Sequence, residues 1–129
     1  MTMDNRIGII GSGGWGTALA SILAENGHSL LLWTKDISTA SEINTQHTNS
    51  VFLPGIILSD QIVATTEASL INACSTVIIT VPTQFIRQVL TEYGFDLSGK
   101  YIVNGSKGIE RQSLLTVSSI LNDIKQCDA

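Results

Sequence analysis

The stretch that decides the fold is Arg6–Gly16, RIGIIGSGGWG, in which a short β-branched run is followed at once by a glycine-rich turn. Gly11, Gly13 and Gly16 have the spacing GxGxxG. Between a strand and a helix, the first glycine permits the tight turn, the second lets the backbone approach a pyrophosphate, and the third lets the helix pack closely on the strand. The helix N-terminus adds free N–H groups and the positive end of its dipole. Glycine-rich turns also occur for structural reasons alone, but this setting favours a dinucleotide site.

Outward from this loop, the sequence alternates between strand-like and helix-like patterns. The run 76–81, TVIITV, is almost wholly apolar and β-branched, as in a parallel strand that is covered on both faces. The patterns predict strands at 6–10, 29–33, 61–65, 76–81 and 101–104, and helices at 15–26, 37–46, 67–73, 84–93 and 114–125. This alternation predicts an α/β protein with a doubly wound parallel sheet of the Rossmann type, formed by residues 1–129 as one domain.

Composition narrows the possible function classes. The 129 residues are 43% hydrophobic and 14% charged, which supports a packed core and excludes a disordered chain. A net charge of −4 argues against a general nucleic-acid binder or a binder of anionic membranes. No apolar run is long enough to span a bilayer, and no signal peptide is recognisable. Cys74 and Cys127 have no disulfide or zinc spacing, so we expect a cytoplasmic protein without a metal site.

Four segments resemble the NAD(P)-dependent glycerol-3-phosphate dehydrogenase family, in the right order along the chain. They are 11–20 (GSGGWGTALA, similar to the family's GxGxWGTALA), 49–55 (NSVFLPG, similar to NxxYLPG), 81–87 (VPTQFIR) and 106–110 (SKGIE, similar to TKGIE). Gly14 departs from the usual Ser or Asn, and Phe52 from the usual Tyr. The first departure removes a side-chain donor near the phosphates, and the second removes a hydroxyl.

The resemblance implies a cofactor, NADP or NAD, and a reaction, the reversible reduction of dihydroxyacetone phosphate to sn-glycerol 3-phosphate for phospholipid synthesis. It implies that the chain is the cofactor-binding part, incomplete at its C-terminal end and inactive alone, because the principal catalytic lysine lies in a second, helical domain. A homodimer stays open. The residues expected to bind the cofactor are Gly11, Ser12, Gly13, Gly14, Trp15, Gly16, Lys35, Pro82, Phe85 and Lys107. Lys107 is also the expected substrate-binding residue.

Each of these side chains also has a structural interpretation. Trp15 could be an aromatic that covers the sheet edge, and the resemblance implies that its backbone lies against the cofactor; both interpretations can hold. Lys35 is either an exposed charge or the cation that binds the 2′-phosphate of NADP, while the neighbouring Asp36 keeps NAD open. Phe85 either packs in the core or lies near the cofactor rings. Lys107 is either a surface lysine or an ammonium that faces nicotinamide and substrate.

Outside the expected site, Cys74 and His28 have structural interpretations, and for the whole chain two alternative functions stay open. Cys74 is expected to end the short helix and to be a small packed residue rather than a nucleophile. His28 is expected in the turn between the first helix and the second strand. The alternative functions are a non-catalytic dinucleotide-binding or sensing module, and another dehydrogenase of the hydroxyacid or ketopantoate type.

Overall fold

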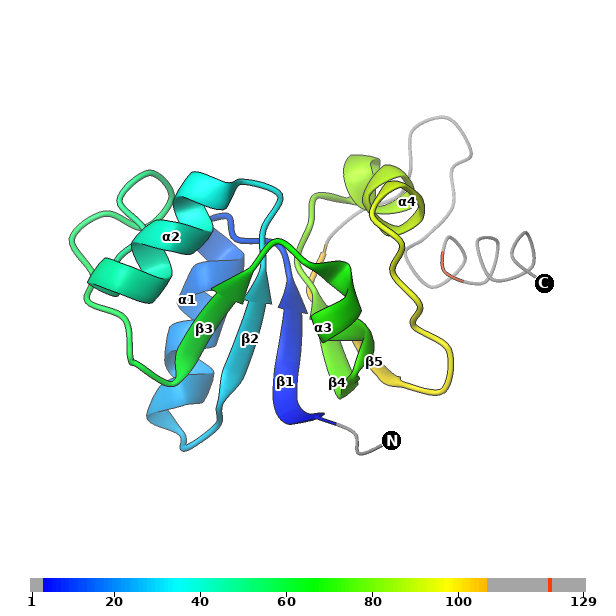
Figure 1. The fold of residues 1–129 in the computed structure, drawn as a ribbon, viewed down its shortest axis with the longest axis horizontal. Coiled ribbons are helices and arrows are strands. Elements are labelled where there is room, and N and C mark those ends of the chain that lie inside the picture. Colours follow the sequence, from blue (N-terminus) through cyan, green and yellow to red (C-terminus); the bar gives the residue numbers. More distant parts are fainter. Residues whose placement is uncertain (1–3, 107–120, 122–129) are drawn as a thin grey trace.

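The computed structural model describes residues 4–106 and residue 121. Over these residues the chain alternates strands with helices from end to end (Figure 1). The strands are β1 (Asp4–Ile10), β2 (Leu30–Trp33), β3 (Ile62–Thr65), β4 (Cys74–Ile79) and β5 (Tyr101–Asn104). The helices are α1 (Gly14–Glu25), α2 (Ile37–Gln46), α3 (Ala68–Asn72) and α4 (Thr83–Glu92).

The strands form one parallel sheet in the order β3-β2-β1-β4-β5. The chain builds outward from β1 to β3 and then returns to place β4 on the other side of β1. This reversal makes the β1–β4 boundary the switch point of the sheet, where ligands of open α/β sheets bind beyond the carboxyl ends of the strands. The predicted Rossmann-type fold is confirmed.

Side chains of the central strands alternate between two cores on opposite faces of the sheet. Ile9 and Ile78 belong to the core beneath α1 and α2, whereas Ile10 and Ile79 belong to the core beneath α3 and α4. Figure 1 shows the same arrangement, with α1 and α2 on one side of the sheet and α3 and α4 on the other. All four isoleucines are buried, which explains why these strands read as continuous apolar runs rather than alternating ones.

The prediction that Cys74 ends a helix is wrong. Helix α3 ends at Asn72, and Cys74 is the first residue of β4, where it pairs with Asp4. Its side chain is fully buried, so it is a small packed residue as expected. The ammonium of Lys100 donates hydrogen bonds to the carbonyl oxygens of Asn72 and Cys74. These bonds satisfy backbone carbonyl groups between the end of α3 and the start of β4.

The helices bear on three further expectations from the sequence. His28 lies in the turn after α1, where its N–H donates to the carbonyl of Leu23, so this prediction is confirmed. The predicted helix at 114–125 falls outside the described residues except for Leu121, which is helical. None of the described helices has the length and apolar character needed to cross a bilayer.

Candidate functional site

The glycine-rich turn begins where β1 ends and crosses the end of β4. Gly11 has a φ of 121°, which lies in the region that only glycine adopts readily. Its N–H donates to the carbonyl of Trp33 over 3.0 Å, and its carbonyl accepts a bond of 3.2 Å from the hydroxyl of Thr80. A Cβ at Gly11 would lie 2.7 Å from that hydroxyl oxygen. The first glycine is therefore required by the turn itself.

The third glycine, Gly16, lets α1 lie against this turn. A Cβ built there would fall 2.2 Å from the carbonyl oxygen of Gly11 and 2.6 Å from the hydroxyl oxygen of Thr80. Real nonbonded contacts of a Cβ are essentially never under 3.0 Å, so any larger residue forces the helix away from the strand. This is the close packing of helix and strand that the glycine spacing predicts.

The second glycine, Gly13, is different, because no backbone or steric constraint among the described residues requires it. Its φ of −65° and ψ of −179° suit any residue, and a Cβ there would meet no atom within 4 Å. No side chain caps the N-terminus of α1 at this position. Gly13 thus leaves free space directly in front of N–H groups that have no partner within the helix. An anionic group fits this space.

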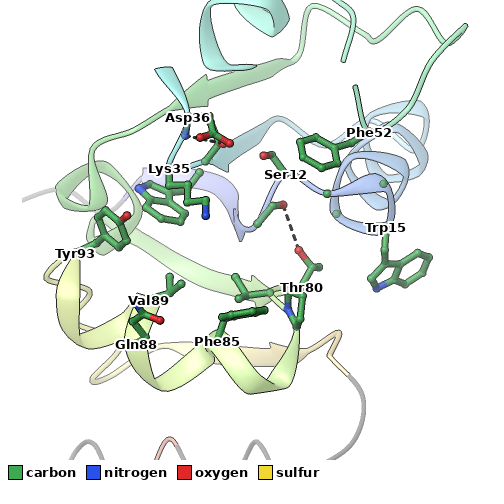
Figure 2. A pocket seen from close by; sticks show the side chains of 18 of the residues that line it. Ser12, Trp15, Lys35, Asp36, Phe52, Thr80, Phe85, Gln88, Val89 and Tyr93 are labelled. Atoms are coloured by element: carbon green, nitrogen blue, oxygen red, sulfur yellow. Dashed lines mark hydrogen bonds between the residues drawn. The ribbon is translucent and has the colours of Figure 1, made fainter. Parts of the chain in front are cut away.

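A cavity of about 480 Å³ opens at this edge of the sheet. It takes walls from the glycine-rich turn, the end of β2, the end of β4 and one side of α4 (Figure 2). Its lining includes the predicted cofactor residues Gly11, Ser12, Gly13, Gly14, Trp15, Gly16, Lys35, Pro82 and Phe85. Lys107 lies outside the described residues.

Two aromatic side chains at the cavity, those of Trp15 and Phe85, are exposed rather than packed in the core. Phe85 keeps 54% of its surface exposed, and it is the next residue, Ile86, that is buried. The core-packing interpretation of Phe85 is therefore wrong. Trp15 is 55% exposed, and its indole N–H donates to the carbonyl of Gly105 over 3.1 Å, just beyond β5. It therefore reaches the edge of the sheet and lines the cavity at the same time.

Lys35 and Asp36 lie two and three residues after the end of β2, and both border the cavity. Both are exposed. The Asp36 N–H donates to the hydroxyl of Thr34 over 3.2 Å, and this bond fixes the start of α2. The segment after β2 therefore offers the cavity one cation and one carboxylate.

Several lining residues were not identified from the sequence. Gln88, Val89 and Glu92 follow Phe85 along α4 at helical spacing, so the helical periodicity counted from Phe85 could have found them. Tyr93 could not be found in this way. It reaches the cavity because its ring packs edge-on against that of Trp33, with ring centroids 4.9 Å apart.

A loop from the segment between α2 and β3 folds back onto the glycine-rich turn. We call residues 47–58 the 47–58 loop; its ends meet where the Leu58 N–H donates to the His47 carbonyl over 2.7 Å. The Glu42 carboxylate accepts bonds from the Thr48 hydroxyl (2.6 Å) and from the Ser50 N–H (2.8 Å). These bonds hold the pKa of Glu42 below its ordinary value. The loop brings Phe52 to the cavity wall.

Comparison with known proteins identifies the family. The family model described as NAD-dependent glycerol-3-phosphate dehydrogenase N-terminus matches residues 6–128. The glycerol-3-phosphate dehydrogenase (NAD(P)+) of Maricaulis maris is 40% identical over 124 residues, which are 95% of this chain and 37% of that protein. The corresponding protein of Lysinibacillus sphaericus is 42% identical over 118 residues, 90% of this chain and 35% of that protein.

A solved structure agrees with the sequence matches. The glycerol-3-phosphate dehydrogenase of Plasmodium falciparum superposes with a TM-score of 0.78 at 26% identity, over 94% of this chain and 38% of the other. The chain thus spans little more than a third of the length of the relatives it matches. It belongs to the NAD-dependent glycerol-3-phosphate dehydrogenase family, whose N-terminal part it matches.

Proposed function

We propose that this chain binds NADP(H) or NAD(H) in the cavity at the switch point of the sheet. The observation that carries the proposal is the free space at Gly13. Neither the backbone conformation of Gly13 nor any neighbouring atom demands glycine, yet a side chain there would fill the space in front of the α1 N-terminus. A bound pyrophosphate would explain the glycine, because a pyrophosphate must approach the backbone N–H groups closely and a side chain at position 13 would block it.

The rest of the cavity suits the remainder of a dinucleotide. Lys35 would bind the 2′-phosphate of NADP, and Asp36 the ribose diol of NAD, since both border the cavity beyond β2. Trp15 and Phe85 supply exposed aromatic surface that would pack against the flat rings of the cofactor. Residues 1–129 would then form one cofactor-binding domain.

We further propose that the domain serves the reduction of dihydroxyacetone phosphate to sn-glycerol 3-phosphate, a step toward phospholipids. The cofactor supplies the hydride, and protein groups orient the carbonyl and neutralise charge on its oxygen. Lys107 is the proposed substrate contact. Ser106, the residue before it in sequence, donates its hydroxyl toward the carbonyls of Ile79, the last residue of β4, and of Val81, which lines the cavity. A cytoplasmic location and a homodimer stay predictions.

Calorimetric titration with NADPH and NADH tests the proposal. Gly13→Val puts a branched side chain where the pyrophosphate must approach, so it is expected to abolish measurable binding while the chain stays folded. Gly27→Asn is the control, because Gly27 lies in the turn after α1, a Cβ there also meets nothing within 4 Å, and asparagine tolerates its positive φ of 92° better than most side chains. Equal affinity in the wild type and Gly13→Val, or no binding of either cofactor by the wild type, would contradict the proposal.

A further inference from the structure

The 47–58 loop contacts the glycine-rich turn through a buried side chain, Asn49, which is 1% exposed. Its amide nitrogen donates to the Ser12 carbonyl over 3.0 Å and to the Thr17 hydroxyl over 2.9 Å. The Thr17 hydroxyl in turn donates to the same Ser12 carbonyl over 3.0 Å. The Asn49 side-chain oxygen accepts a long bond of 3.4 Å from the Phe52 N–H. Both amide hydrogens of Asn49 therefore have acceptors.

These bonds fix one particular peptide group, the one that joins Ser12 to Gly13. Its carbonyl oxygen accepts from Asn49 and from Thr17, which uses both of its lone pairs. A trans peptide is rigid and planar, so its N–H points opposite to its C=O. The N–H of Gly13 is thereby held pointing away from Asn49 and Thr17. This is the amide of the residue that leaves open space for an anion.

The loop also lies directly on the next residue of the turn. A Cβ at Gly14 would come within 2.9 Å of the Phe52 carbonyl oxygen. The absence of a side chain at Gly14 therefore lets Phe52 approach, and with it the backbone that carries Asn49. Glu42 holds the loop from its other side through Thr48 and Ser50. The loop is thus tied to α2 and to the turn at once.

We propose that Asn49 is a positioning residue for the dinucleotide: it fixes the Ser12–Gly13 peptide so that the Gly13 N–H is oriented before a pyrophosphate arrives. The inference rests on the proposed cofactor site. Asn49 itself would not touch the ligand. It acts by removing the conformational freedom that the turn would otherwise lose on binding.

Asn49→Asp tests the role of the amide donors, because it keeps the shape of the side chain and replaces the donating nitrogen with an oxygen. Its matched control is Asn44→Asp. Asn44 makes the same kind of bonds, donating to the Ala64 carbonyl over 2.9 Å and accepting from the Ala64 N–H, but it ties α2 to β3 away from the turn. We expect Asn49→Asp to weaken NADPH and NADH binding about tenfold or more, and Asn44→Asp to leave both affinities unchanged.

A second pair of variants decides the question even where Asn49→Asp does not fold. Thr17→Val removes the hydroxyl that bonds Asn49 and Ser12, and Thr17→Ser keeps it. We expect Thr17→Val to weaken cofactor binding about fivefold, the effect of one lost hydrogen bond, and Thr17→Ser to restore it. Urea unfolding of every variant gives the folded fraction, by which each dissociation constant is corrected.

An amide resonance supplies a readout that a purely structural role would not move. In ¹H–¹⁵N NMR spectra of the unliganded chain, the Gly13 amide is expected to shift and broaden in Asn49→Asp and to stay in place in Asn44→Asp. Wild-type affinity of Asn49→Asp or of folded Thr17→Val, or losses fully explained by the folded fraction, would overturn the inference while leaving the cofactor site intact. Absence of binding by the wild type would instead refute the proposed function.

Discussion

Gly13 and Gly16 belong to one motif, yet the structure predicts opposite consequences for substitutions at the two positions. In Gly16→Ala the new methyl group would lie 2.2 Å from the Gly11 carbonyl oxygen, far inside the optimal separation of about 3.5 Å. The helix must shift by about 1 Å, and overpacking of this kind costs about 3 kcal/mol. Alanine returns about 1 kcal/mol through its better helix propensity. The net loss is about 2 kcal/mol, which lowers the melting temperature of a domain of this size by about 8 °C.

Gly13→Ser is the matched substitution. Serine is a favoured residue at the start of a helix, and the extended backbone of Gly13 suits it, so the stability should rise by a few tenths of a kcal/mol or stay equal. Its side chain nevertheless occupies the space reserved for the ligand, so the affinity for NADPH should fall. Thermal unfolding followed by circular dichroism gives the stabilities, and calorimetric titration gives the affinities.

Either of two results with Gly16→Ala and Gly13→Ser would refute this reasoning. A Gly16→Ala chain that melts at the wild-type temperature would show that α1 does not press against the turn. A Gly13→Ser chain that loses as much stability as Gly16→Ala, or that binds NADPH like the wild type, would show that the space at Gly13 is not kept for a ligand.

Three further predictions concern charge and turnover. Lys35→Asp is expected to lower the ratio of NADPH affinity to NADH affinity, because it replaces a cation by a carboxylate, which repels the negatively charged 2′-phosphate. An unchanged ratio in titrations would make Lys35 an ordinary surface lysine. Because the pKa of Glu42 is lowered in the folded state, its stabilising effect is present above the ordinary glutamate pKa and is lost as the pH falls through the folded value. The wild type should therefore exceed Glu42→Gln in urea midpoint at neutral pH, and this difference should shrink as the pH falls below the ordinary glutamate pKa of about 4.3; a difference that stays constant through this acid range would contradict this assignment. A protein of these 129 residues alone should bind NADPH but not oxidise it with dihydroxyacetone phosphate, since it spans only 37% of a related dehydrogenase; robust turnover would disprove this.

The strand-helix alternation could be predicted because it depends on local patterns. The strand at 101–104 is observed with the predicted bounds, and that at 6–10 is extended by two residues, to Asp4–Ile10. The boundary at Cys74 was misplaced because Cys74 joins the sheet through its pairing with Asp4, a partner seventy residues away. Such distant pairing leaves no periodic signal in the sequence around it.

In the candidate site, too, features that depend on neighbouring residues could be predicted, whereas features that depend on distant residues could not. The glycine-rich turn and Lys35, which line the cavity, could be singled out because each prediction depends on only a few adjacent residues. The role of Asn49 could not be identified, because its partners Ser12 and Thr17 lie more than thirty residues away in sequence. Phe85 was ambiguous for a related reason: only the rotation of α4 about its axis decides whether Phe85 or Ile86 enters the core.

The position of the cavity between two cores has a consequence for the motions of the whole domain. The α1 and α4 helices cover opposite faces of the sheet, and both contribute walls to the cavity. A dinucleotide bound there would contact both helix layers at once. At a concentration of one hundred times its dissociation constant it would add about 2.7 kcal/mol of stability. Amide hydrogen exchange should therefore slow in α1 and α4 together, since opening either layer would require the ligand to leave.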